Sequence, residues 1–369
     1  MLASVESQRR GVDFWIKNAE FDSYHADNPR RHTNCSRSND MYFKPYNEKD
    51  IRKRCGIVLA GGDGVRLRSF VQRIRGDDLP KQYVRCMGGH SMLESTICRL
   101  LKLIPAERIF AVMSRDHFQF PDVRQQMERH PKVNVVTQPE NRDTGVGLML
   151  PLAHLSMRFP DSTVAVFPSD HYVSNDDLFM AHVDAAFAIV ERDSSKIVLL
   201  GIPPTSAEID YGYILPQQET GSPSPFGTRA VRRFSEKPTA VVARNIVSMG
   251  GLWNTLVMIF NTVNFINCLC RTNAELYDYF ARIRDVLVEE KSSNEVASIY
   301  AQAKPINLSR GFLEAFPKIC PELLLVMPVR RVKWSDCGSE KRMMEALREH
   351  QKSCISKRIF LRQREILAP

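Results

Sequence analysis

The sequence lacks the features that mark membrane and secreted proteins. No apolar run approaches the roughly 18 residues that cross a bilayer, and the amino terminus has no apolar stretch of the kind found in signal peptides. Its nine cysteines include no C-x-x-C pair and no cysteine–histidine spacing typical of zinc sites, and their number is odd. We therefore expect reduced thiols in a cytoplasmic protein.

Internal repeats are also missing, and the overall charge does not identify a partner. The 369 residues carry 51 Lys and Arg against 42 Asp and Glu, which gives a net charge of +9. An excess of cations suits a nucleotide, a nucleic acid or a membrane surface, and the balance alone does not choose among them.

Residues 1–54 resemble an extension with little order of its own. They hold 11 Lys and Arg and 8 Asp and Glu, and they show neither helical nor strand periodicity. This mixture is typical of a solvated tail. A nucleic-acid-binding tail is the alternative, although the segment contains no recognisable binding motif.

From residue 56 the pattern becomes that of an α/β fold. Residues 56–60 are a short apolar run that ends in glycines, as expected of a buried parallel strand entering a long loop. Ser91 and Glu94 then have capping-box spacing for a helix reaching Pro105. Strands at 109–113, 133–136, 163–167 and 197–200 alternate with helices at 116–129, 144–158 and 176–192. This alternation predicts a Rossmann-like, mostly parallel sheet flanked by helices, with ligands at the carboxyl ends of the strands.

After Ile202 the alternation stops. Strand-like pieces at 213–215 and 230–234 predict a β-hairpin inserted over the ligand edge of the sheet. Beyond residue 261 we expect mainly helix, then strands at 323–327 and 332–334 and a helix from Ser339. We divide the chain into the extension (1–54), a main domain (55–315) and a short C-terminal segment (316–369) that completes the site and caps the domain.

The strongest local signal is the glycine-rich loop after the first strand. Glycines let backbone N–H groups approach a phosphate chain closely, and an arginine can pair with phosphoryl oxygens. A P-loop would end in Gly-Lys-Ser/Thr, and a dinucleotide fingerprint would need glycine in place of Leu67, so neither fits. The loop runs Leu59, Ala60, Gly61, Gly62, Asp63, Gly64, Val65, Arg66.

This loop resembles the signature of the sugar 1-phosphate nucleotidyltransferases, L-A-G-G-x-G-T-R-L followed by Pro-Lys. Pro80-Lys81-Gln82 supplies the second half of the signature. The glutamine after the lysine makes the motif similar to that of the bacterial-type mannose-1-phosphate guanylyltransferases. Further motifs follow in the family's order, at residues 138–144, 167–171, 211–213, 234–238, 253–254 and 334–339.

The resemblance implies an enzyme that uses Mg²⁺ to make GDP-mannose and pyrophosphate from GTP and mannose 1-phosphate. A sugar phosphate oxygen would attack the α-phosphorus in line. The alternatives are the same reaction with another sugar 1-phosphate or nucleoside triphosphate, or a catalytically silent homologue that binds nucleotide sugar and regulates a partner. No nucleic acid or membrane partner is expected, and a homodimer is compatible with the sequence.

Site roles follow from the same resemblance. Arg66, Lys81 and Asp170 are the expected catalytic residues, and Asp170 and Asp336 the expected Mg²⁺ ligands, because that ion prefers carboxylate and phosphate oxygens. Residues 59–64 would bind the nucleotide together with Gln138 and Pro139, which lie near the base. The expected sugar phosphate contacts are Gly212, Glu236, Lys237 and Asn254.

Some of these residues have plainer explanations. Asp170 could cap the helix that follows it, and Asp336 could cap the helix near Ser339. Arg142 fits a phosphate contact and a surface ion pair equally well. Trp253 and Trp334 are expected to pack beneath the site.

Four features depart from the family pattern, one of them being Gly145-Val146-Gly147 in place of a small Ala/Pro-containing stretch. Val65 replaces the usual Thr, which removes a hydroxyl but keeps the backbone N–H. Asp143 stands where relatives often have Gly, and Leu256 stands where a Ser-Gly pair often follows the Asn. These changes leave the charged positions intact, so they concern the identity of the sugar more than the type of reaction.

Overall fold

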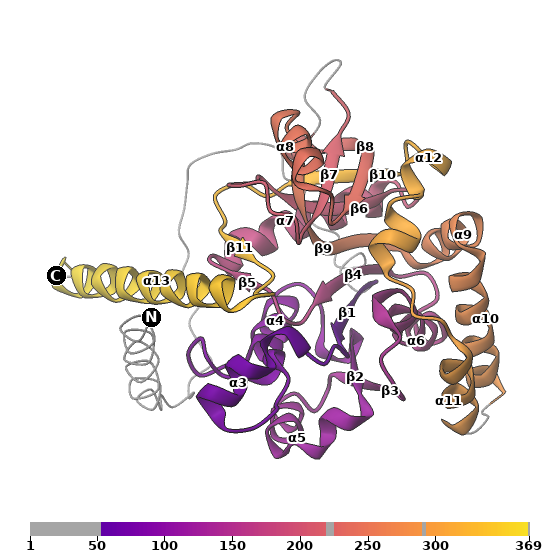
Figure 1. The fold of residues 1–369 in the computed structure, drawn as a ribbon, viewed down its shortest axis with the longest axis horizontal. Helices are drawn as coiled ribbons and strands as arrows, with labels where there is room; N and C mark the ends of the chain where they lie inside the picture. The colour runs from indigo at the N-terminus through magenta and orange to yellow at the C-terminus, as the bar shows by residue number, and fades with distance from the viewer. Residues whose placement is uncertain (1–52, 219–224, 290–292, 368–369) are drawn as a thin grey trace.

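A computed structural model describes residues 53–218, 225–289 and 293–367, arranged around one nine-stranded sheet (Figure 1). The extension expected at 1–54 therefore lies almost entirely outside the described residues. In spatial order the strands are β3 (Asn134–Gln138), β2 (Ile109–Ser114), β1 (Arg54–Ala60), β4 (Thr163–Pro168), β9 (Leu252–Asn261), β6 (Ile197–Ile202), β10 (Leu324–Pro328), β8 (Arg229–Glu236) and β7 (Gly212–Pro216).

The predicted parallel arrangement is confirmed for most of this sheet. Strands β3, β2, β1 and β4 are parallel neighbours, and β6 pairs in parallel with β10. Only β8 and β9 run against the other described strands of this sheet. Because β1 to β4 point the same way, the loops that follow them meet at one edge.

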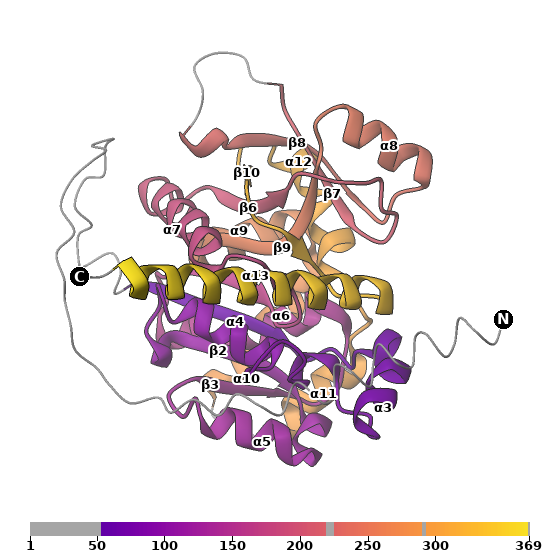
Figure 2. The ribbon, with the colours of Figure 1, turned by 90° about the vertical axis from the view of Figure 1, so that its left-hand side faces the viewer.

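Helices cover both faces of the sheet, each over its own apolar core. One core lies under α4 (Met92–Leu100), α5 (Pro121–Glu128) and α7 (Asp176–Arg192). The other lies under α6 (Asp143–Arg158), α9 (Thr262–Thr272) and α10 (Ala274–Val288), with α11 (Ser293–Gln302) beside them (Figures 1 and 2). Alternate residues of β1 serve the two cores, Val58 one and Ile57 the other, as a strand buried on both faces requires.

Local sequence signals explain where several helices begin. The capping box of α4 is present: Ser91 Oγ accepts from the Glu94 N–H, and the Glu94 carboxylate accepts from the Ser91 N–H. Helix α7 starts at Asn175, whose side chain accepts from the Leu178 N–H. Because Asn175 is that cap, Asp170 is not, which leaves its carboxylate for the edge of the sheet.

Three expectations from the sequence need correction. The β7–β8 hairpin does not lie over the ligand edge but extends the sheet itself, since β8 pairs with β10 and β7 with β9. The long loop after β1 contains a helix, α3 (Arg68–Arg75). The single helix expected at 116–129 is instead a 3-10 turn (Arg115–Gln119) followed by α5, because Pro121 starts a new helix. The central strand β9 was not predicted.

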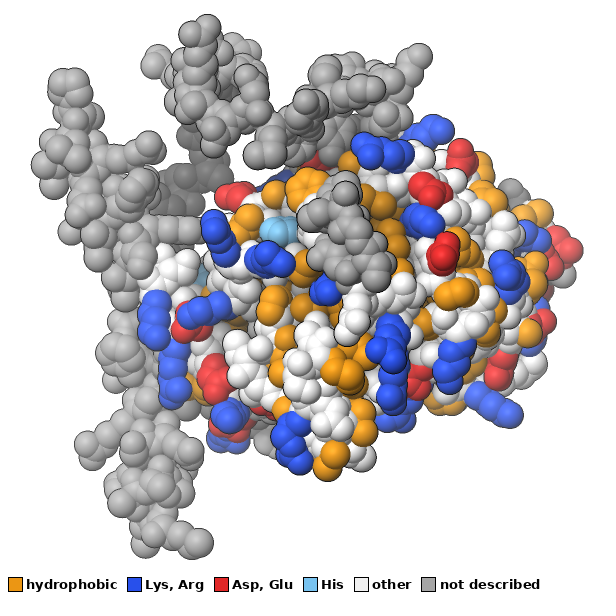
Figure 3. Space-filling view, turned by 90° about the horizontal axis from the view of Figure 1, so that it is seen from above, with side chains coloured by type: hydrophobic (Ala, Val, Ile, Leu, Met, Phe, Trp, Pro, Cys, Tyr) orange, Lys and Arg blue, Asp and Glu red, His pale blue; other side chains and the backbone are white. Residues whose placement is uncertain are grey.

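The last part of the chain returns to the sheet before leaving it. After the short α12 (Phe316–Ile319) comes β10; β11 (Trp334–Ser335) pairs with β5 (Tyr172–Val173), and α13 (Glu340–Leu367) projects past the body of the domain (Figures 1 and 2). Helix α8 (Ala240–Ser248) covers the end where β7 and β8 lie. At that end, cationic side chains are spread among apolar ones (Figure 3). Among the described residues, no helix has the length and apolarity to cross a membrane.

Candidate active site

A cavity of about 300 Å³ opens at the carboxyl ends of the first four strands. Each strand contributes one residue at or near its end: Leu59 from β1, Val112 from β2, Gln138 from β3 and Pro168 from β4. The strands therefore place the loops that follow them around a common space, as the parallel topology predicted.

The glycine loop forms one wall of the cavity, and its carbonyl oxygens accept from two glutamine side chains that also line the cavity. Gln82 Nε2 donates to Ala60 O at 3.1 Å and to Gly62 O at 2.7 Å, and Gln138 Nε2 donates to Gly61 O at 3.2 Å. Since each peptide unit is planar and trans, the N–H groups that follow point away from these carbonyls. The loop thus has the arrangement of a backbone cradle for an anion.

Close approach explains why the loop needs glycine at particular positions. A Cβ on Gly61 would lie 2.3 Å from Gln138 Nε2, and Gly64 has a left-handed φ of 61°. At Gly62, by contrast, a Cβ would meet nothing within 4 Å. Gly62 therefore faces open space in the cavity, where a bound group could lie against the backbone.

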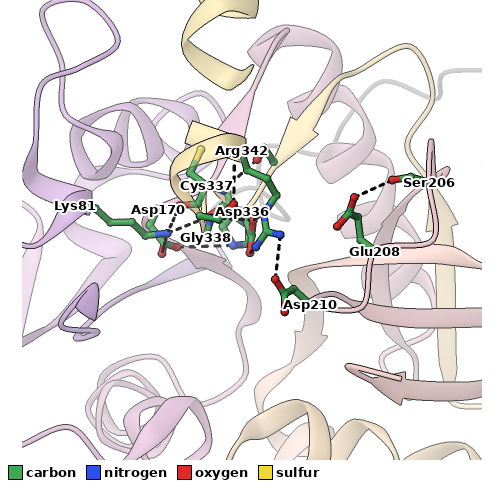
Figure 4. A network of polar contacts seen from close by, with 12 residues as sticks. Lys81, Asp170, Ser206, Glu208, Asp210, Asp336, Cys337, Gly338 and Arg342 are labelled. Atoms are coloured by element: carbon green, nitrogen blue, oxygen red, sulfur yellow. Dashed lines mark hydrogen bonds and ion pairs between the residues drawn. The ribbon is translucent and has the colours of Figure 1, made fainter. Parts of the chain in front are cut away.

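The two expected cations reach the cavity in different ways. Arg66 is exposed and lines the cavity, and no ion pair of its guanidinium is found in the described part of the chain. Lys81 is nearly buried, and its Nζ lies 2.9 Å from Asp170 Oδ2, 2.9 Å from Asp336 O and 3.0 Å from Cys337 O (Figure 4). Lys81 thus connects the loop after β4 with the segment after β11.

Asp170 lines the cavity two residues beyond β4. Burial opposes ionisation of its carboxyl group, but Lys81 and His171 outweigh it and hold the pKa below its usual value. His171 Nε2 lies 3.7 Å from Asp170 Oδ1, and its ring packs edge-on against Trp334. Asp170 is therefore an ionised carboxylate at neutral pH.

Asp336 is held by a residue that the sequence analysis did not single out. Arg342 Nε lies 2.8 Å from Asp336 Oδ1, and Asp336 Oδ1 also accepts from the Gly338 N–H at 3.0 Å. The Arg342 guanidinium reaches Asp210 at 3.3 Å as well (Figure 4). It also lies over the Tyr211 ring. Arg342 stands in the first turn of α13, six residues after Asp336, and no motif in the sequence marked it as a partner.

Asp170 and Asp336 both line the cavity, so the structure brings together the two expected metal ligands. Two carboxylates suit Mg²⁺, which is commonly held by one or two such groups together with substrate phosphates and water. Within the described residues no group of three or more His, Cys, Asp or Glu side chains converges on a metal position. Two carboxylates therefore fit a metal ion that is also bound by substrate phosphate. In this structure Asp170 is paired with Lys81, and Asp336 with Arg342.

The expected sugar contacts form a second cluster outside the cavity lining. A Cβ on Gly212 would lie 2.6 Å from Glu236 Oε2 and 3.4 Å from Asn254 Cβ, so these three residues are adjacent. Burial raises the pKa of the Glu236 carboxyl above its usual value, although Lys237 and Ser309 oppose the shift. Leu256 lines the cavity, and its N–H donates to Asn254 Oδ1, which links this cluster to the cavity. Lys237 is exposed, and it and Pro139 are not part of the cavity lining.

Two departures from the family pattern place residues with side chains at left-handed backbone positions. Asp143 and Leu256 have φ of 65° and 59°, in the left-handed region where glycine is favoured. The Asp143 side chain bonds the Thr144 N–H and accepts from Asn307 Nδ2, which supports its conformation. Leu256 has no polar side chain to do this.

The remaining expectations can be placed as well. Arg142 pairs with Glu140 at 2.9 Å, which favours the surface ion pair over a phosphate contact. Trp253 and Trp334 are buried, and both pack against the ring of Tyr211, with centroids 4.9 and 5.3 Å away. Trp334 also packs against His171, which lines the cavity.

Several known proteins resemble this chain in sequence. The chain is 29% identical over 223 residues to the xanthan biosynthesis protein XanB of Xanthomonas campestris and 27% identical over 226 residues to the mannose-1-phosphate guanylyltransferase of Escherichia coli. Each match covers 60% of this chain, and 45% and 46% of those proteins, so the chain spans about half the length of these relatives.

Solved structures share the fold. A protein from Thermus thermophilus described as mannose-1-phosphate geranyltransferase superposes with a TM-score of 0.64 at 25% identity, over 78% of this chain and 76% of that one. A UDP-glucose pyrophosphorylase bound to UDP-glucose gives a TM-score of 0.51 at 13% identity, over 81% of this chain and 98% of that one, which shows a common fold alone. The family model for nucleotidyl transferases matches residues 55–353. The chain therefore belongs to the nucleotidyl transferase family.

Proposed function

We propose that this protein is a mannose-1-phosphate guanylyltransferase that forms GDP-mannose and pyrophosphate from GTP and mannose 1-phosphate. One observation carries the proposal: Gly62, Arg66, Lys81, Asp170 and Asp336, from separate segments, line one cavity at the carboxyl edge of the sheet. The choice of guanine and mannose is supported by the relatives that carry that activity in their names.

In this proposal the chain's own residues mainly position reactants and neutralise charge, because both substrates are anions. The glycine loop would hold the triphosphate through its N–H groups. Arg66, which has no carboxylate partner in the described residues, would pair with the phosphates. The sugar phosphate oxygen attacks the α-phosphorus, the bond to the β-phosphate oxygen breaks, and pyrophosphate leaves with that electron pair.

Asp170 and Asp336 would hold Mg²⁺. When bound, the ion would supply charge neutralisation on the phosphates. Lys81 bridges Asp170 and the 336–337 backbone, so it would keep the two carboxylate-bearing segments at a fixed spacing. The sugar would lie toward Gly212, Glu236 and Asn254, whose polar atoms can pair with hydroxyl groups.

The test is pyrophosphate release with Mg²⁺, measured for GTP, ATP, UTP and CTP against several sugar 1-phosphates. We expect release with GTP and mannose 1-phosphate well above every other pair. A different preferred pair would establish the same chemistry with other substrates. No release with any pair would contradict the enzymatic proposal.

The second candidate is a catalytically silent homologue that binds nucleotide sugar, and the Arg342–Asp336 ion pair favours it. A guanidinium beside an expected metal ligand could displace the ion.

Replacing Arg342 with Met separates the two possibilities, with Lys341→Ala, on the same turn, as the control. If Arg342 displaces metal, Mn²⁺ affinity measured by electron paramagnetic resonance and turnover both rise. If Arg342 orients Asp336, turnover falls, and a loss of about tenfold corresponds to one charged hydrogen bond.

A further inference from the structure

Beside the glycine loop, a series of polar contacts runs from the buried Tyr83 and His117 to the exposed Asp63, and none of these three residues lines the cavity. Tyr83 is fully buried, and its hydroxyl lies 3.1 Å from Ala60 O and 2.9 Å from His117 Nδ1. His117 is 3% exposed, and its Nε2 lies 3.3 Å from Asp63 Oδ1. Asn141 Nδ2 donates to Asp63 Oδ2 at 3.2 Å. The contacts thus start at the end of β1 and return to the same loop three residues later.

We propose that His117 is a positioning residue of the glycine loop, holding it in the form that receives the nucleoside triphosphate. The inference rests on the proposed function of that loop. His117, Tyr83 and Asp63 do not line the cavity, so His117 acts on the loop rather than on the substrate.

The number of protons fixes how the network is connected. Asp63 offers only acceptors, so His117 Nε2 must carry a proton and donate it. In the neutral ring Nδ1 is then an acceptor, and the single hydroxyl proton of Tyr83 goes to it. Ala60 O still receives the Gln82 amide at 3.1 Å, so every polar atom of the network has a partner. Neutral His117 with Nε2–H therefore leaves every polar atom with a partner, with the Tyr83 hydroxyl donating to His117 Nδ1 in place of Ala60 O.

The charges around the ring agree with a neutral form. Burial lowers the pKa of His117, against the opposing effect of Asp63 and Asp116, the two carboxylates that face it. Tyr83 packs edge-on against the ring at 5.3 Å and stays protonated, because burial raises its pKa. Asp63 side-chain exposure is 44%, so Asp63 can shift with the loop when His117 is removed.

The test compares His117→Leu, which removes both contacts, with the conservative His117→Gln and with Tyr83→Phe. His130→Gln is the matched control, since His130 also has a pKa lowered by burial but makes none of these contacts. Three quantities are measured: binding of GTP, the KM for mannose 1-phosphate, and amide hydrogen exchange of residues 61–64 without ligand. Circular dichroism establishes that each variant is folded.

In His117→Leu we expect the GTP dissociation constant to rise about tenfold, as for loss of one charged hydrogen bond, with the KM for mannose 1-phosphate within about twofold of wild type. Loop exchange should accelerate, and His117→Gln should recover part of both losses. Ring ¹⁵N shifts of the wild type should report the Nε2–H tautomer. Folded His117 variants with wild-type GTP affinity and loop exchange would overturn the inference. If the wild type binds no triphosphate while loop exchange still rises in the variants, the proposed function fails and the positioning role stands.

Discussion

Lys81 Nζ and Asp170 Oδ2 lie 2.9 Å apart in the wall of the cavity, although the two residues come from different loops. Lys81 also donates to two carbonyls of the segment that carries Asp336. One ammonium group therefore ties together three parts of the site. A free phosphate-binding lysine would be expected to reach open space, whereas this one already has a partner for each of its three protons.

Replacing Lys81 with Ala should therefore reduce both turnover and stability. Loss of a preorganised cation should lower kcat/KM by about a hundredfold, or about 3 kcal/mol. Unpaired Asp170 and two unpaired carbonyls should lower the free energy of unfolding by about 1–3 kcal/mol. Pyrophosphate release and urea unfolding measure the two effects separately.

The control for that variant is Lys102→Ala. Lys102 pairs with Asp177 at the surface, and such exposed pairs contribute at most about 1 kcal/mol. We expect wild-type turnover and nearly wild-type stability. If Lys81→Ala behaves like Lys102→Ala, the assigned role of Lys81 in the site is wrong.

Adjacent glycines of the loop give a second prediction. Gly61→Ala would put a Cβ 2.3 Å from Gln138 Nε2, and this overpacking should cost about 1–3 kcal/mol of stability and disturb the loop. Gly62→Ala meets nothing within 4 Å and should fold like the wild type. It should nevertheless bind GTP more weakly, because its methyl group occupies the space where a phosphate would lie against the backbone.

Thermal unfolding and GTP titration of the two variants test this directly. Equal stability of Gly61→Ala and Gly62→Ala would show that Gln138 moves aside easily. Undiminished GTP affinity in Gly62→Ala would show that the triphosphate does not lie on this part of the loop.

The sequence predicted those strands and helices whose own residues mark where they begin or end. Strand β1 ends in glycines, and α4 begins with the Ser91–Glu94 capping box, so both could be located from local residues. Strand β9 could not, because its position between β4 and β6 depends on pairing with residues about 50 to 100 positions earlier in the chain. The hairpin was recognised, but its place in the sheet depends on β9 and β10 in the same way.

For the site, residue types could be predicted but their partners could not. The motifs identified Lys81, Asp170 and Asp336 as charged groups, yet their ion pairs depend on side-chain packing that spacing does not encode. His117 carries no motif of its own and became visible only through its contacts with Tyr83 and Asp63.

Leu256 gives a third prediction. A leucine at φ of 59° is strained by roughly 1–2 kcal/mol relative to glycine, and its side chain lines the cavity. Leu256→Gly should therefore lose little stability despite removing an apolar side chain, and should widen the cavity. Melting temperature and the sugar phosphate panel are the measurements. Leu256→Ala is the control, since it shortens the side chain without relieving the backbone, and it should be less stable than Leu256→Gly.

Glu236 links stability to pH in a direction that can be worked out. Because burial raises its pKa in the folded protein above the ordinary 4.5, the folded state keeps a proton that the unfolded state releases between those two values. Stability due to Glu236 therefore falls as pH rises through this interval, and ionised Glu236 destabilises the fold at neutral pH.

Glu236→Gln should be more stable than the wild type at pH 7.5, and the difference should shrink toward pH 4.5. If Glu236 also contacts the sugar, the same variant should lose about tenfold in kcat/KM for mannose 1-phosphate. Glu345→Gln, at an exposed position, should change neither quantity. Urea unfolding across this pH range decides the matter, because a stability difference that does not vary with pH would show that Glu236 titrates normally.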